Sequence, residues 1–130
     1  MKFLHNDFEF TLDDEWWAAA DMEGWKPLSR SYRSFPNAHD VLFADVNPTY
    51  ERKLKYGVFG DDPVTGKTAR DRVIDILRCF RKNDTLPPVE IIKAPFGAPH
   101  EVTLFHGAHR FYLSIAAGFT HVPAVKGPSL

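Results

Sequence analysis

The stretch LFHGAHRFYLSIAAG, residues 104–118, decides how we interpret the fold. An apolar run ends at the polar segment 106–110, and apolar residues at helical spacing begin directly afterwards. Gly107 can adopt a positive φ, which lets the chain turn sharply from one element into the next. The order predicts a strand over 101–105, a turn, and a helix over about 110–117 that ends at Gly118.

The same turn is a candidate anion site. The amides of residues 108–110 would lie at the start of a helix, where the macrodipole favours negative charge. Arg110 adds a planar guanidinium suited to phosphate oxygens, and His109 adds a ring donor. The alternative is a tight turn in which His109 is satisfied internally and Arg110 is solvated.

Composition narrows the class of protein. A chain of 130 residues with 44% hydrophobic residues suits one folded domain, and a net charge of −1 argues against a dedicated non-specific DNA binder. Residues 1–65 carry 7 basic and 12 acidic side chains, a balance of −5, whereas residues 66–130 carry 9 and 5, a balance of +4. The basic half contains the turn, which favours an anionic ligand there.

Processing and targeting signals are not evident. The single cysteine, Cys79, excludes an internal disulfide. The first residues, MKFLHNDFEF, lack a signal-peptide core, and no apolar run approaches the roughly 20 residues of a membrane span. We therefore expect a soluble cytoplasmic protein without membrane partners.

The remaining elements follow from periodicity and turn residues. The clearest is a helix over 69–82, which begins at the capping pattern Thr68-x-x-Asp71. We further predict strands over 8–12, 41–46, 89–93 and 121–125, a short helix from 13 or 14 to 22, and irregular chain over 26–40. Mixed strands and helices in this order predict an α+β fold with a small mixed sheet packed with helices.

The segment GDDPVTGKT, residues 60–68, superficially matches a phosphate-binding P-loop. That pattern needs four residues between its glycines, and here there are five. Pro63 removes one amide, and Asp61 and Asp62 would repel phosphate. We predict a surface turn that leads into the helix cap, from which Lys67 could still reach an anion.

Three motifs in the C-terminal half occur in a recognisable order: LPPV at 86–89, FHGAHR at 105–110 and VPAV at 122–125. Together they resemble the ParB/sulfiredoxin superfamily, and the resemblance covers about residues 41–127. It implies a ParB/sulfiredoxin-like domain over 41–130. Residues 1–40 lie outside the resemblance and are expected to form an N-terminal strand-helix extension packed on that domain.

The resemblance also implies a nucleotide-binding pocket. Phosphates would lie on the turn, at Gly107, His109 and Arg110 with Ala108 between them. Looser candidates come from the start of the long helix, where the alignment can slip by one residue: Thr68, Arg70 and Arg72. The expected ligand is ATP or CTP with Mg²⁺, an ion that needs few protein ligands.

Departures from the family limit the chemistry. Ala108 stands where sulfiredoxins carry their catalytic cysteine and where ParB partition proteins carry a glutamate, and no helix-turn-helix module is present. A carboxylate from elsewhere could serve phosphotransfer, but nothing in the sequence selects among Glu51, Asp61, Asp62 and Glu101. No two histidines are spaced so as to share one face of a predicted helix, and only His106-x-x-His109 is a candidate metal-binding pair. We therefore predict no metal site built by the protein alone.

The leading hypothesis is a nucleotide- or phosphate-binding protein that acts as a nucleotide-dependent phosphotransferase or hydrolase on an unknown small-molecule or protein substrate. Two alternatives stay open. One is a non-catalytic module that binds a nucleotide or a phospho-ligand, and the other is a ParB-like nuclease or DNA-associated protein, for which net charge gives no support. A homodimer is compatible with each of them.

Overall fold

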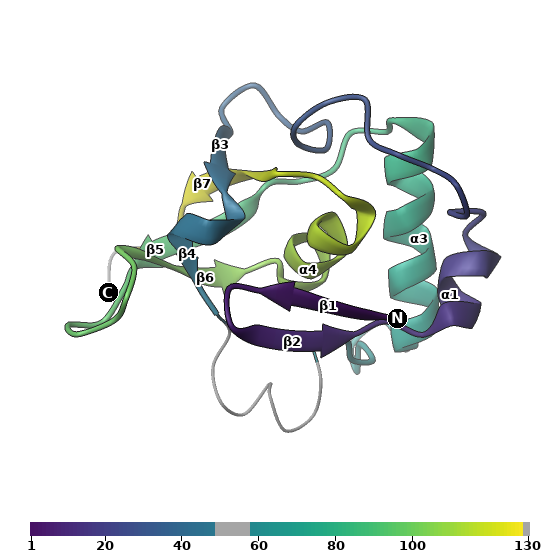
Figure 1. Cartoon of the computed structure of the whole chain (residues 1–130), viewed down its shortest axis with the longest axis horizontal. Helices are drawn as coiled ribbons and strands as arrows, with labels where there is room; N and C mark the ends of the chain where they lie inside the picture. The colour runs from purple at the N-terminus through teal and green to yellow at the C-terminus, as the bar shows by residue number, and fades with distance from the viewer. Residues whose placement is uncertain (49–57, 129–130) are drawn as a thin grey trace.

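The structure is a computed structural model of the chain, and it describes residues 1–48 and 58–128 (Figure 1). Within these ranges it contains three α-helices, a two-stranded sheet and a five-stranded sheet. The predicted α+β class is therefore confirmed. The elements in chain order are β1 (Lys2–His5), β2 (Phe8–Thr11), α1 (Asp14–Ala19), β3 (His39–Leu42), the 3-10 turn η1 (Phe43–Asp45), β4 (Val46–Asn47), α3 (Ala69–Lys82), β5 (Val89–Lys93), β6 (Val102–His106), α4 (Ala108–Ala117) and β7 (His121–Lys126).

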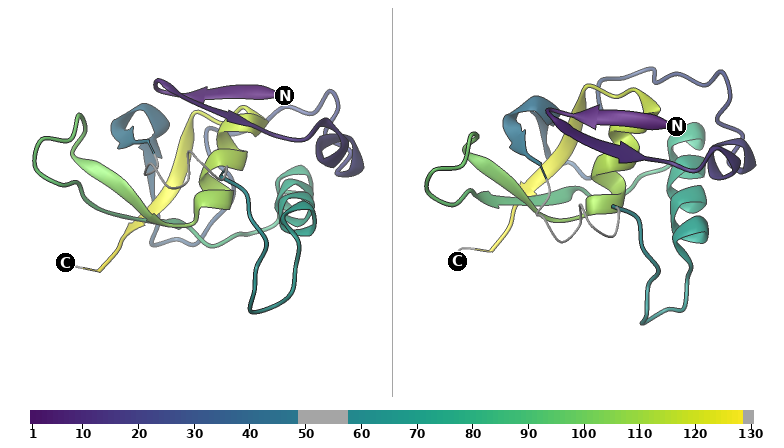
Figure 2. Two further views of the ribbon diagram at one scale, coloured as in Figure 1. Left: turned by 90° about the horizontal axis from the view of Figure 1, so that it is seen from below. Right: turned by 60° about the horizontal axis from the view of Figure 1, so that its bottom comes forward.

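The five-stranded sheet is mixed and curled, with the strand order β3-β7-β5-β6-β4. Strand β5 is antiparallel to β6 and parallel to β7, while β3 is antiparallel to β7 and β4 parallel to β6. Helix α4 packs between this sheet, the β1–β2 hairpin and α3 (Figures 1 and 2). Its nearly complete burial explains why the sequence 111–117 is apolar on more than one face.

Helix α3 has the predicted bounds. Thr68 caps its N-terminus, and Asn83 ends it with φ of 57°, a left-handed conformation that asparagine tolerates well. Val73, Leu77 and Phe80 are buried on the predicted apolar face, and Ile76 packs at its edge. Amphipathic spacing and the capping pattern at Thr68 together located this helix.

The N-terminal region departs from the prediction by one strand. Where a single strand was expected, β1 and β2 form a hairpin around Asn6-Asp7, with Asn6 at φ of 53°. The hairpin is held by burial against α4, since the His5 ring lies 5.0 Å from Phe111 and the Phe10 ring 5.0 Å from Tyr112. Helix α1 also ends at Ala19, earlier than the predicted residue 22.

The prediction of one continuous strand over 41–46 is wrong. The chain forms β3 over His39–Leu42, turns through η1, and resumes as the short β4 at the opposite edge of the sheet. Phe43 causes the break, because its buried ring packs 5.2 Å from Phe111 of α4 instead of continuing the strand. Asn47 then fixes β4, donating from Nδ2 to the carbonyl oxygens of His100 and Val102.

Residues 1–40 are part of the same hydrophobic core. They contribute buried side chains, and the loop before β3 is tied to the C-terminal half by hydrogen bonds. The Tyr32 hydroxyl donates to the Pro87 carbonyl at 2.6 Å, and the Arg30 carbonyl accepts from the amides of Thr120 and His121. The buried side chains from this segment include Phe10, Leu12, Ala20, Met22 and Tyr32. Among the described residues, no helix is both long and apolar enough to cross a membrane.

Candidate functional site

The strand-to-helix turn consists of a single residue, Gly107. Strand β6 runs to His106 and α4 begins at Ala108, two residues earlier than predicted. Gly107 has φ of 100°, as the prediction of a positive φ required, and a Cβ there would lie 2.9 Å from Cγ1 of Val89 and 3.2 Å from its Cα. Any larger residue would be both strained and obstructed, so the start of α4 is held directly against β5.

The N-terminus of α4 has no side-chain cap. Gly107 is its N-cap residue and offers no hydroxyl or carboxylate to the first amides, unlike Thr68 at α3 and Asp13 at α1. The first turn of α4 also contains no acidic residue. The positive end of the helix dipole is therefore not compensated by a nearby carboxylate of this helix.

Arg110 is half-buried, which differs from the solvated arginine of the alternative interpretation. Its Nη2 donates to the Pro88 carbonyl at 3.3 Å, so it connects the LPPV motif to the turn. Its Nε is buried and has no hydrogen-bond partner among the described residues. Burial raises the pKa of Tyr32 to about 12, and the neighbouring Arg110 guanidinium opposes that rise.

His109 and Arg72 both contact the backbone of Gly60. The Gly60 amide donates to Nε2 of His109 at 3.2 Å, and Nη1 of Arg72 donates to the Gly60 carbonyl at 2.7 Å. The Phe59 ring packs beside the His109 ring, with centroids 5.6 Å apart. The backbone of Gly60 thus brings together a predicted site residue of α3 and one of α4. We call Gly107, Ala108, His109, Arg110 and Arg72 the α4 turn site.

Two other predicted residues are engaged at the start of α3. Oγ1 of Thr68 accepts from the Asp71 amide at 3.1 Å, as the capping pattern predicted, and Oδ1 of Asp61 accepts from the Ala69 amide at 2.7 Å. Arg70 turns toward α1 and pairs with both carboxylate oxygens of Glu15, at 2.6 and 3.0 Å. This hydrogen-bonded pairing lowers the pKa of Glu15.

The segment 60–68 is a closed acidic turn that leads into the α3 cap, as predicted. Oδ1 of Asp62 accepts from the amides of Val64 and Thr65, and these bonds lower the pKa of the carboxyl group. The Asp62 amide also donates to the Lys67 carbonyl, and Lys67 Nζ pairs with Asp75 at 3.2 Å. Side chains of this turn therefore accept hydrogen bonds from its own amides, whereas the amides of a P-loop are free to bind phosphate.

The candidate carboxylates that the structure describes are divided between the turn before α3 and the β5–β6 hairpin, and Asp62 interacts electrostatically with Arg72 of the α4 turn site. Asp61 and Asp62 serve the turn before α3, whereas Glu101 lies on the hairpin at the far end of β6. Glu51 lies outside the described residues. Nδ1 of His106 lies 3.6 Å from the Glu90 carboxylate, and no three metal-binding side chains gather anywhere in the described part.

The donors of the α4 turn site are of the kind that suits an anion, and Ala108 supplies no nucleophile. Helix amides, Arg110 and Arg72 are donors, while Ala108 contributes only a methyl group and is 9% exposed. Sequence reasoning missed Tyr32, Gly60 and Pro88 as partners. The double proline of LPPV was a usable signal for Pro88, but no local pattern marks Tyr32 or Gly60, whose roles arise from long-range contacts.

Comparisons with protein-family models, with curated proteins and with solved structures found no match to this chain.

Proposed function

We propose that the protein binds a nucleotide or another phosphate-bearing ligand at the α4 turn site, in a ParB/sulfiredoxin-like fold. One observation carries the proposal most directly. The buried Nε of Arg110 has no acceptor among the described residues and lies at a helix start that has no side-chain cap. An unsatisfied buried donor costs about 1–3 kcal/mol, so a ligand oxygen that reached it would recover that free energy.

The residues present fit a phosphate group. The amides at the start of α4 and the guanidinium of Arg110 would hold its oxygens, and Arg72, which contacts the Gly60 backbone beside His109, would add a second positive charge. Mg²⁺ bound to the phosphates of ATP or CTP would neutralise part of their charge and needs few protein ligands. A nucleotide-dependent phosphotransferase or hydrolase remains the enzymatic form of this proposal.

A non-catalytic binding module is the second candidate, and specific contacts favour it. Ala108 offers no reactive group, and Asp61 and Asp62 are committed to structural hydrogen bonds. The absent thiol also means that we expect no reduction of sulfinylated proteins by the sulfiredoxin route. For a ParB-like DNA-associated protein we find only the family resemblance, against a net charge of −1.

Calorimetric titration with ATP and CTP in the presence of Mg²⁺, inorganic phosphate and duplex DNA tests the proposal. Arg110→Ala should weaken nucleotide binding by about 10- to 150-fold, because a charge-assisted contact contributes about 1.5–3 kcal/mol. Arg70→Ala is the matched control, since Arg70 pairs with Glu15 and should leave affinity unchanged. Arg110→Lys, which keeps the charge but not the planar fork, should lie between the two.

Affinity must be expressed per folded molecule, because Arg110→Ala also removes the bond to Pro88. Circular dichroism gives the folded fraction of each variant. Absence of binding by the wild-type protein at millimolar nucleotide and phosphate would refute the proposal, as would equal losses in Arg110→Ala and Arg70→Ala. Product formation from ATP or CTP would separate the enzyme from the binding module.

A further inference from the structure

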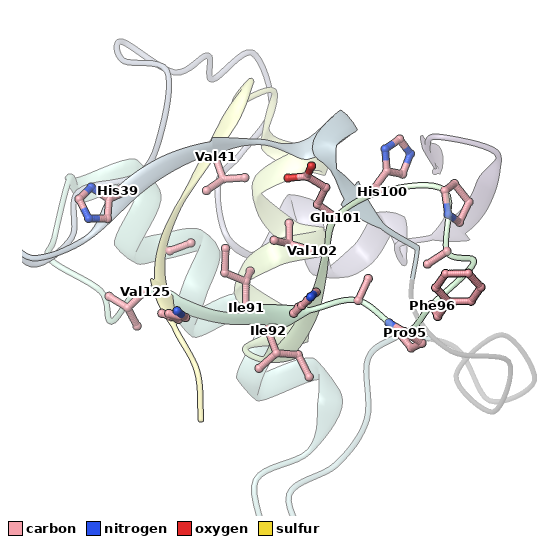
Figure 3. Close-up of a pocket in the computed structure, with 16 residues that line it drawn as sticks. His39, Val41, Ile91, Ile92, Pro95, Phe96, His100, Glu101, Val102 and Val125 are labelled. Atoms are coloured by element: carbon pink, nitrogen blue, oxygen red, sulfur yellow. The ribbon is translucent and has the colours of Figure 1, made fainter. Parts of the chain in front are cut away.

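A cavity lies at the end of the curled sheet that is opposite the α4 turn site. Side chains that alternate along β5 and β7 share its concave face, where the register pairs Val89 with Ala124 and Ile91 with Lys126. Val89 and Val122 are buried in the core, but Ile91 and Lys93 follow Val89 on the same face toward the β5–β6 hairpin. Beyond the part covered by α4, this face opens into a cavity of about 750 Å³ (Figure 3).

The cavity wall is mainly apolar. Val41 from β3, Ile91 from β5 and Val102 from β6 point toward one another across it, and Pro95 and Phe96 of the hairpin border one side (Figure 3). Phe96 is fully exposed, and the three central side chains are only partly buried. The volume lies within the range of about 300–1,000 Å³ that small-molecule sites occupy. The cavity can therefore accommodate the body of a drug-sized apolar ligand.

The charged groups around the cavity are mostly basic. Among the described residues, the cavity is lined by Lys93, Lys126, His39 and His100 and by one carboxylate, that of Glu101, which extends toward β3 (Figure 3). Neither lysine forms an ion pair with any described residue. Two ammonium groups beside an apolar hollow complement a ligand that has an apolar body and an anionic group.

We propose that this cavity binds a small amphipathic anion, namely a molecule with an aromatic or branched apolar body and one carboxylate or sulfonate group. The body would contact Val41, Ile91 and Val102, and the anionic group would lie near Lys93 and Lys126. The site is separate from the α4 turn site. Strand β5 contacts Gly107 at its Val89 end, and it reaches the cavity at its Lys93 end.

Two fluorescent probes of similar shape test the proposal. Anilinonaphthalene sulfonate has the apolar body and the anionic group, and phenylnaphthylamine has the body alone. We expect saturable binding of the sulfonate with one site. Val102→Phe, which fills the cavity, should weaken binding of both probes by about tenfold or more. Val64→Phe is the matched control, because Val64 is 92% exposed in the turn before α3.

The charge requirement has its own pair of variants. Lys93→Ala with Lys126→Ala should weaken sulfonate binding by about fivefold and leave phenylnaphthylamine binding unchanged. Lys26→Ala with Lys82→Ala makes the same change in net charge at exposed positions that do not line the cavity, and should affect neither probe. Equal losses in both lysine pairs would overturn the anionic preference.

Partly folded proteins also bind such probes, so near-ultraviolet circular dichroism must confirm native packing for each variant. Isoleucine-methyl NMR of the wild-type protein keeps the proposal testable if Val102→Phe does not fold. The Ile91 methyl resonance should shift on titration with the sulfonate, while those of Ile74 and Ile115 should not, because neither lines the cavity. No saturable binding by the folded wild type, or shifts confined to isoleucines outside the cavity, would overturn it.

Discussion

The N-termini of α3 and α4 solve the same physical problem in opposite ways. Both helices begin with amides that lack partners within the helix. At α3, Asp61 and Thr68 accept from the amides of Ala69 and Asp71, so two side chains of the chain itself occupy the positions where an anion would bind. At α4, Gly107 provides no capping group, and the first turn of the helix contains no acidic residue.

This difference shows how a segment that only resembles a P-loop, residues 60–68, can be distinguished from a candidate anion site, the α4 turn site. Both segments contain glycine and a basic residue, yet the α3 segment also contains carboxylates placed to bond its own amides. The acidic residues, and not the glycine spacing alone, identify a helix start that is already satisfied.

The largest effect should come from Gly107→Ala. A left-handed φ costs an alanine about 1–2 kcal/mol, and overlap of the new Cβ with Val89 adds about 1–3 kcal/mol. We expect the free energy of unfolding to fall by about 3 kcal/mol in urea denaturation. Gly66→Ala is the control, because Gly66 has φ of 77° but no atom within 4 Å of an added Cβ, and it should lose only about 1 kcal/mol. Equal losses would show that contact with Val89 does not matter.

Removal of the α3 cap should have a smaller effect. Thr68→Ala deletes the acceptor for the Asp71 amide and should lower the free energy of unfolding by about 1 kcal/mol, whereas Thr68→Ser should retain most of it. The same denaturation experiment measures both variants. If Thr68→Ala were neutral, the contrast between a capped α3 and an uncapped α4 would carry no energetic meaning.

A pH-dependent effect is expected where the N-terminal hairpin packs on α4. Burial lowers the pKa of His5 from 6.5 more than the bond to the Phe43 carbonyl raises it, and its Nδ1 has no partner among the described residues. Below pH 6.5 the unfolded state takes up a proton that folded His5 resists, so stability should fall as the pH decreases from 6.5 toward the lowered pKa.

Urea denaturation at a series of pH values measures this linkage. His5→Gln should show a shallower decline over the same window, because the titrating ring is gone. A wild-type protein whose stability rises as the pH falls through this window would contradict the assignment of a buried neutral imidazole.

The smallest effect should come from Arg70→Ala. The Arg70–Glu15 pair is exposed, and exposed ion pairs contribute little because water and salt screen them. Thermal melts at low and high salt should therefore differ little between this variant and the wild type. A large loss at high salt would mean that α1 depends on this contact, and Arg70 would then be a poor control for Arg110.

Local patterns predicted the elements whose signals are local. The amphipathic spacing of α3 and the glycines at 107 and 118 were enough to define two helices, since capping and periodicity are properties of neighbouring residues. The break at Phe43 and the extra strand β1 were missed because both depend on burial against α4. This helix lies about 70 to 100 residues away along the chain. Tertiary packing, which no short window contains, decided these two regions.

The candidate site was predictable in the turn but less so in α3. Arg70 and Arg72 were equal candidates in the sequence, but residues two apart on a helix differ by about 200° around its axis. They must face nearly opposite directions, and the structure directs Arg72 to Gly60 and Arg70 to Glu15. The angular separation on the helix could have shown that only one of these two arginines belongs to the site. Only the packing of α1 on α3 shows which of them it is.

The interruption of the strand at η1 has a consequence for association between chains. Because the chain leaves one side of the sheet after Leu42 and joins the other at Val46, the two edge strands are only four and two residues long. Short edges present few unpaired amides and carbonyls on which another polypeptide could add a strand. Besides filling the core, Phe43 therefore interrupts the chain where a longer edge strand would otherwise form, so the five-stranded sheet of the described residues offers little template for strand addition.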